Sequence, residues 1–261
     1  MNYNYHTHTF RCNHASGTPE EYVKRATGNG IKYMGFSEHF PYICRDGYEA
    51  RYRLPTSQIG EYFREIGDLR EKYKNEIDIK IGFEMEYYHG LFDTMLENAV
   101  KYGAEYLILG PHFIDEEHPG GIYAMTLTEN EADYVKYADC VVDGIKSNVF
   151  TYVAHPDLFN YVGNEEIYKR EAERICRASL EYGVPLEINF LGIRTGRNYP
   201  NEAFWEVAGR IGSPVTFGFD AHDAMSAYDG ESLKKAEKLV EKYGLNYIGR
   251  PKIILLKDII K

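Results

Sequence analysis

Short apolar runs alternate with longer amphipathic stretches along almost the whole of this 261-residue sequence. Several runs are nearly continuous, as in Tyr106-Leu107-Ile108-Leu109, which is typical of strands covered on both faces in a parallel sheet. We expect seven strands, at residues 2–6, 32–37, 77–84, 106–110, 150–155, 185–190 and 214–219. Repetition of a strand followed by a helix predicts an α/β protein with a mainly parallel sheet.

The stretches between these runs have the apolar spacing of helices. Thr18-Pro19-Glu20-Glu21 and Thr128-Glu129-Asn130-Glu131 both have the form of a capping box, and Ser57 is the expected cap of a helix between them. Further helices are expected near 91–100, 165–182, 201–211 and 231–243. An open doubly wound sheet and a closed barrel both accommodate this order. No glycine-rich phosphate loop follows the first strand and polar residues end nearly every strand, so a barrel of seven or eight units is favoured.

The acidic composition limits the partners of this chain. Lys and Arg number 30 against 40 Asp and Glu, a formal charge of -10, which argues against a nucleic-acid binder but not against a small anionic substrate. The sequence has no apolar stretch of about 18 residues and no signal-peptide pattern at its start, so neither a membrane span nor secretion is expected. Its four cysteines form no C-x-x-C pair. We expect one domain over residues 1–261, in the reducing cytoplasm and of undefined oligomeric state.

Histidines gather at the ends of the predicted strands. Seven of the nine lie there: His6, His8, His14, His39, His112, His155 and His222. Glu84 closes the third strand and Asp220 follows the seventh. A single histidine at a strand end is most often a hydrogen-bonded packing residue. In a parallel barrel, however, all carboxyl ends of the strands meet at one face, and clustered imidazoles and carboxylates are the ligands of divalent metals. The repeated placement therefore predicts a metal cluster at that face.

These motifs resemble those of the polymerase and histidinol phosphatase (PHP) family. The resemblance covers almost the whole chain and rests on His6-x-His8, His14, Glu38-His39, Gly82-x-Glu84, His112, His155 and Asp220-x-His222, in that order. It implies a distorted (β/α)7 barrel with two or three divalent metal ions, and zinc, iron and manganese all suit these ligands. It also implies three ligand sets: His6, His8, Glu84 and Asp220; Glu84, His112 and His155; and His14, His39 and His222. Glu84 would bridge the first two ions, because a neutral imidazole has only one lone pair for a metal.

Within this family, segment 186–194 resembles the histidinol-phosphate phosphatases. That resemblance implies hydrolysis of a small phosphate monoester, L-histidinol phosphate, to L-histidinol and inorganic phosphate. Glu84, Asp220 and His222 are then the expected catalytic residues, and Arg194, Arg197 and His39 are expected to bind the substrate. Arg194 matches an arginine of those phosphatases, whereas Asn160 and Tyr161 stand where some relatives have a basic residue.

A metal cluster would make the site locally positive in an acidic protein. Three divalent ions against two carboxylates leave about four positive charges, which attract a phosphate dianion. Metals about 3.5–4 Å apart share a hydroxide that attacks phosphorus in line. The sequence offers Asp220, His222 and a metal-bound water as alternative general acids.

Three other functions stay open from the sequence. One is a PHP phosphoesterase acting on nucleotides or another small phosphate ester. One is an amidohydrolase-like C–N hydrolase, in which His14, His39 and His222 would have no ligand role. The third is a metal sensor or store without catalysis.

Four residues near these ligands have smaller expected roles. Glu86 shares a strand face with Glu84 and is its rival for the bridge. Cys12 is expected to be a bystander, although a thiol between His8 and His14 would suit a soft metal. Glu38 and Asp157 adjoin ligand histidines and are expected to orient them.

Overall fold

The computed structural model describes residues 1–44 and 46–259, and within them eight parallel strands form one sheet. Neighbours in the sheet are also neighbours in sequence, from β1 to β8, as in a barrel built from successive strand-and-helix units. The strands are β1 (Tyr3–Asn4), β2 (Tyr33–His39), β3 (Asp78–Met85), β4 (Tyr106–Leu109), β5 (Phe150–Val153), β6 (Leu186–Asn189), β7 (Pro214–Gly218) and β8 (Asn246–Tyr247). The predicted α/β barrel class is confirmed, with a two-residue strand beyond the seven predicted.

The barrel closes directly between its first and seventh strands at the carboxyl end. Beyond β1 and β7, Thr7 and Ala221 form a parallel bridge. The His8 N–H donates to the Ala221 carbonyl at 3.0 Å, and the Ala221 N–H donates to the His6 carbonyl at 3.2 Å. At the opposite end, β8 pairs with β7 instead. The closure therefore places the histidine-rich segment after β1 beside the segment after β7.

Two separate cores explain why the apolar runs are continuous in sequence. Leu107 and Leu109 of β4 join the large core between the strands and the helices, whereas Tyr106 and Ile108 join a small core inside the barrel. Successive residues of a strand point to opposite faces. A strand with both faces buried is apolar at every position, and this is the pattern that the sequence shows.

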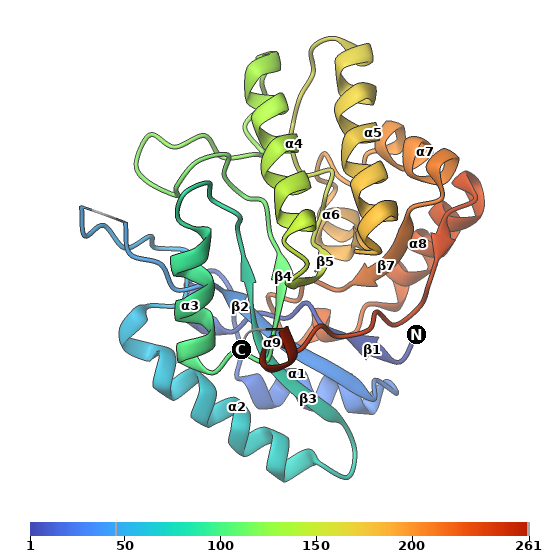
Figure 1. Ribbon diagram of the computed structural model, residues 1–261. Helices are drawn as coiled ribbons and strands as arrows, with labels where there is room; N and C mark the ends of the chain where they lie inside the picture. The colour runs from blue at the N-terminus through green and yellow to red at the C-terminus, as the bar shows by residue number, and fades with distance from the viewer. Residues whose placement is uncertain (45, 260–261) are drawn as a thin grey trace.

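Most helices surround the strands (Figure 1). They are α1 (Pro19–Gly28), α2 (Ile59–Tyr73), α3 (Phe92–Tyr102), α4 (Glu131–Lys146), α5 (Glu165–Tyr182), α6 (Phe190–Thr195), α7 (Glu202–Ile211), α8 (Gly230–Tyr243) and α9 (Leu256–Ile259), with 3-10 turns η1 (Phe10–Cys12), η2 (Thr56–Gln58) and η3 (Met225–Ala227). None of the described helices is both long and apolar enough to cross a membrane.

The predicted helix caps have mixed outcomes. The capping box of Thr18 and Glu21 is confirmed, with the Thr18 side chain accepting from the Glu21 N–H. The second capping box is wrong, because the side chain of Asn130, not Thr128, caps α4. The cap predicted at Ser57 is also wrong, because the 3-10 turn η2 leads directly into α2.

Candidate metal centre and active site

The nine predicted metal ligands gather at the carboxyl ends of the strands. His6 and His8 follow β1, His14 follows η1, His39 ends β2, Glu84 lies in β3, His112 follows β4, His155 follows β5, and Asp220 and His222 follow β7. Glu84 is at the centre, with its carboxylate oxygens 2.9 to 3.4 Å from ring nitrogens of His6, His8, His39, His112 and His155. Convergence of strand ends thus brings residues far apart in sequence into contact.

Four buried atoms of this cluster lie close together and are called the first group below. Glu84 Oε2 lies 3.4 Å from Nε2 of both His6 and His8, and Asp220 Oδ1 lies 3.6 Å and 3.4 Å from the same two nitrogens. None of these four atoms has a hydrogen-bond partner among the described residues, which is costly for buried polar atoms. A tetrahedral metal with bonds of about 2.0–2.1 Å separates its ligand atoms by about 3.3–3.4 Å. The group therefore fits one divalent ion.

Hydrogen bonds on the outer side of four rings orient them for metal binding. The acceptors near Nδ1 are Glu187 for His6 at 2.8 Å, Glu38 for His8 at 3.3 Å, Glu86 for His112 at 3.0 Å and the Cys12 carbonyl for His14 at 2.8 Å. An acceptor at Nδ1 favours the proton on that nitrogen and leaves the lone pair of Nε2 for a metal. Glu38 thus orients a ligand ring as predicted, but the ring is that of His8 and not that of its sequence neighbour His39.

The second oxygen of Glu84 faces a different pair of histidines. Oε1 lies 2.9 Å from His155 Nε2 and 3.3 Å from His112 Nε2. Since Oε2 belongs to the first group, the carboxylate faces both groups, as a bridge must. Glu86 faces elsewhere. Its carboxylate contacts His112 Nδ1 and accepts hydrogen bonds from both terminal nitrogens of the buried Arg53, at 2.7 and 2.6 Å. Glu84 is therefore our proposed bridging ligand.

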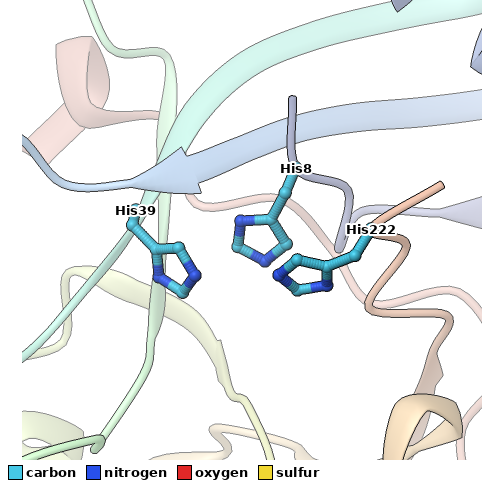
Figure 2. A group of neighbouring side chains, drawn as sticks. All are labelled: His8, His39 and His222. Atoms are coloured by element: carbon cyan, nitrogen blue, oxygen red, sulfur yellow. The ribbon is translucent and has the colours of Figure 1, made fainter. Parts of the chain in front are cut away.

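The third predicted ligand set is less compact. Measured between ring centres, His14 lies 4.6 Å from His222 and 5.2 Å from His39, while His39 and His222 are 6.1 Å apart. Nε2 of His14 and Nε2 of His222 are 3.0 Å apart. The rings of His39 and His222 instead lie on either side of His8, each stacked with its centre 4.2 Å away (Figure 2). Nδ1 of His39 also lies 3.2 Å from Glu84 Oε2. The structure thus pairs His14 with His222 and turns His39 towards the first group.

Two proposed ligands have a left-handed backbone. His155 has φ 30° and Asp220 has φ 47°. This conformation costs a residue other than glycine about 1–3 kcal/mol and is concentrated at functional sites. Arg194 holds Asp220 in place, since its guanidinium donates to the backbone carbonyls of Phe219 at 2.7 Å and Asp220 at 2.5 Å.

Arg194 makes backbone contacts that the sequence did not predict, and its grip on phosphate stays a prediction. Arg194 lies near the end of α6, a helix not expected from the sequence, and this helix directs its side chain to the backbone beyond β7. Its guanidinium is committed to the two carbonyls, and Arg194 is not among the residues that line the pocket. Arg197, three residues later, lines the pocket and donates to the Tyr199 hydroxyl at 3.0 Å.

A cavity of about 560 Å³ opens above the metal-ligand cluster. Its lining includes the proposed ligands His14, His39, His112, His155, Asp220 and His222, together with Arg197, Glu117 and the rings of Tyr52, Phe113, Tyr123 and Tyr199. Two of the three predicted substrate-binding residues, Arg197 and His39, thus reach the pocket. The cavity size is within the range that holds small-molecule ligands.

The rings of the cluster differ in their charge without metal. Burial disfavours the charged form of His8, but hydrogen bonds and charges of Asp220, Glu38 and Glu84 outweigh burial and raise its pKa to about 9. Burial and the neighbouring His222 lower the pKa of His14 to about 4. Burial would raise the pKa of Glu84, yet the surrounding imidazoles hold it well below its ordinary value. The metal-free protein therefore binds protons where the carboxylates gather and keeps the His14 ring neutral.

Glu187 and Asn189 are polar residues of the site that sequence reasoning missed. Glu187 contacts the His6 ring and also accepts from the His155 backbone N–H at 3.1 Å. Asn189 donates to Glu187 at 2.8 Å and to Asp220 at 3.0 Å. The signal was present in β6, where two polar residues at alternate positions of an apolar strand share one face.

Asp157 does not orient a histidine, so that prediction is wrong. Its carboxylate accepts from the Asn201 backbone N–H at 2.6 Å and from the Trp205 indole at 2.8 Å, and it fixes the start of α7. Cys12 is buried, and its thiol lies 3.2 Å from the Thr9 carbonyl, to which it donates. Its sulfur is also near the ring nitrogens of His14 and His222.

Comparisons with known proteins agree with this geometry. The family model of the PHP domain matches residues 4–190. A probable histidinol-phosphatase of Deinococcus radiodurans is 25% identical over 225 residues, covering 83% of this chain and 85% of that protein. The histidinol-phosphatase of Bacillus subtilis is 26% identical over 253 residues, covering 84% and 92%. A solved structure of histidinol phosphate phosphatase from Lactococcus lactis, in complex with zinc, L-histidinol and phosphate, has a similar fold, with a TM-score of 0.70, 23% identity and coverage of 94% and 95%.

Proposed function

Because the chain belongs to the PHP domain family, we propose that it is a metal-dependent phosphatase that hydrolyses L-histidinol phosphate to L-histidinol and inorganic phosphate. The observation that carries this proposal is the group of four unpartnered atoms of His6, His8, Glu84 and Asp220 beneath a pocket that contains an arginine. The histidinol-phosphatases among its relatives, and the bound histidinol and phosphate in the similar solved structure, support this choice of substrate.

The residues of the site have distinct proposed roles. Bound divalent ions would supply activated water and neutralise charge on the phosphoryl group. Glu84 and Asp220 hold the negative charge that retains such ions, and the guanidinium of Arg197 offers paired donors to phosphate oxygens. His222 lines the pocket beside Asp220, with Nδ1 3.1 Å from Oδ1, and its proposed catalytic role is to hold a bound ion through Nε2. The closeness of His14 and His222 favours a third metal position, which a C–N hydrolase with one or two metals would not need.

A phosphate-release assay on protein of measured metal content tests the function. We expect histidinol phosphate to be hydrolysed with a kcat/KM at least about tenfold above those of mononucleotides, since the carboxylates of Glu86 and Glu117 line the pocket and favour an alcohol that carries a positive charge. Treatment with a chelator should abolish the activity, and added zinc, manganese or iron should restore it. Equal turnover of nucleotides, or full activity without metal, would contradict the proposal.

Replacement of Arg197 and of Arg194 tests which of the two predicted arginines binds the phosphate. We expect Arg197→Ala to lower kcat/KM for histidinol phosphate by about 10- to 100-fold, since charged hydrogen bonds contribute about 1.5–3 kcal/mol. Arg194→Ala is the matched comparison and should instead reduce metal content, because Arg194 holds the backbone of Asp220. A fall in kcat/KM with Arg194→Ala at full metal content, and none with Arg197→Ala, would assign phosphate binding to Arg194 instead.

Two further expectations are parts of the same proposal. A single catalytic domain is proposed because strands from Tyr3 to Tyr247 belong to one sheet. A cytoplasmic location is proposed because all four cysteines, Cys12, Cys44, Cys140 and Cys176, are free thiols.

A further inference from the structure

We infer that Glu117 forms a cation-binding subsite of the pocket and selects phosphate esters whose alcohol carries an ammonium group. The inference rests on the proposed phosphatase function and concerns recognition of the leaving alcohol. Glu117 lies in the segment between β4 and α4, where Phe113 and Tyr123 form an antiparallel bridge with their rings centred 5.3 Å apart. Glu117, Phe113 and Tyr123 all line the pocket that contains the metal ligands.

The side of the pocket that contains Glu117, called this wall below, carries a net negative charge. Arg53 is 2% exposed and binds both oxygens of Glu86, at 2.7 and 2.6 Å, while its Nε donates to Glu117 Oε2 at 2.6 Å. One buried cation thus faces two carboxylates, so the three groups together carry one net negative charge. Arg53 does not line the pocket, whereas both carboxylates do. A ligand at this wall therefore meets the acidic groups and not the arginine.

Glu117 is the carboxylate of this pair that a ligand reaches. Its side chain is 15% exposed, compared with 2% for Glu86. Arg53 binds only Oε2 of Glu117, and across residues 1–44 and 46–259 no hydrogen bond to Oε1 is found. In Glu86, by contrast, Oε1 contacts the His112 ring and Oε2 accepts from Arg53, so both oxygens have partners. Glu117 Oε1 is therefore the free acceptor for a cationic group.

The pocket consequently contains both signs of charge. Arg197 and the metal-ligand residues are placed for a phosphate, and Glu117 is placed for an ammonium. The rings of Tyr52, Phe113 and Tyr123 provide flat apolar surface in the same pocket. This combination predicts a substrate with a phosphate, a cationic amine and a planar ring, and it disfavours phosphate esters of uncharged or acidic alcohols.

Substitution of Glu117 by glutamine tests this subsite. Glutamine still accepts the hydrogen bond from Arg53 but removes the charge. We expect Glu117→Gln to lower kcat/KM for histidinol phosphate by about 10- to 100-fold, mainly through KM, and to leave hydrolysis of 4-nitrophenyl phosphate within about twofold of wild type. Glu117→Asp keeps the charge and should retain the preference for histidinol phosphate. Equal losses on both substrates, or no loss on either, would overturn the inference.

Glu116 provides a matched control in the same segment. Its carboxylate accepts from the Tyr42 hydroxyl at 2.7 Å, and it lines a different cavity. Glu116→Gln should leave both activities unchanged, and the same selective loss in this variant would overturn the assignment to Glu117.

A failure of the proposed function can be told apart from a failure of this inference. If wild type does not cleave histidinol phosphate, the proposed substrate is wrong. Inhibition of 4-nitrophenyl phosphate hydrolysis by histidinol then decides the inference. Inhibition of wild type that is weakened at least about tenfold in Glu117→Gln supports the subsite, and absence of inhibition or equal inhibition of both proteins overturns it.

Discussion

Glu84→Gln is expected to lose at least one metal ion per chain and to lower kcat/KM for histidinol phosphate by at least about 1,000-fold. The two oxygens of Glu84 face different histidine groups, at distances of 2.9 to 3.4 Å. A glutamine has one acceptor oxygen, and its amide nitrogen has no lone pair for a metal. The variant would therefore uncouple the two groups and remove a charge that retains the ions, and metal-ion catalysis is worth several kcal/mol.

Glu86→Gln is the matched control for this variant. Glu86 lies two residues further along the chain and is just as buried, but it acts on the cluster only through the His112 ring. A lost partner of a metal-binding histidine costs about 10- to 100-fold in metal affinity or activity. Elemental analysis and phosphate release should therefore rank Glu84→Gln well below Glu86→Gln. Full metal content with ordinary turnover in Glu84→Gln would show that Glu84 does not bridge two metal ions.

Much of the fold was predictable because the barrel buries both faces of its strands. Leu107 and Leu109 pack outwards while Tyr106 and Ile108 pack inwards, so β4 stands out as one apolar run. The first strand is shorter than predicted because the Asn4 side chain accepts the His6 N–H at 3.1 Å. The eighth strand, Asn246–Tyr247, has two residues, one exposed and one half-buried, which is too little for an apolar pattern to appear.

The gathering of the nine candidate ligands was predictable for a topological reason, whereas the arginines were not. Parallel strands of a barrel deliver their carboxyl ends to one face, so each strand-end histidine could be placed without coordinates. Arg194 lies in a connection whose direction depends on α6, and sequence position alone did not reveal that its donors meet backbone carbonyls. Arg53 was equally hidden, since an arginine on a loop is usually solvated and this one is almost fully buried.

Metal binding by the group of His6, His8, Glu84 and Asp220 is expected to release protons at pH 7.5 and to weaken as the pH falls. Burial opposes protonation of His6 and His8, but the neighbouring carboxylates outweigh burial, raising the pKa of His6 well above its ordinary value and that of His8 to about 9. The ring of His8 is therefore protonated without metal at pH 7.5, the raised pKa of His6 favours its protonated form, and a protonated ring must lose a proton to bind a metal through Nε2. Lower pH thus favours the metal-free form, by about tenfold in apparent affinity per pH unit for each displaced proton.

The His14 and His222 pair should behave in the opposite way, and this contrast makes the prediction specific. Burial and the nearby His222 lower the pKa of His14 to about 4, and burial and the nearby His8 also lower the pKa of His222, so a metal at this pair displaces no proton near neutrality. Titrating metal into chelator-treated protein, by calorimetry in two buffers of different ionisation enthalpy, measures the protons released at each step. His14→Ala should remove a metal equivalent without changing the number of protons that metal binding at His6 and His8 releases. If metal binding releases no protons and its affinity does not change between pH 6 and 8, Glu84 and Asp220 do not hold protonated rings in the metal-free protein.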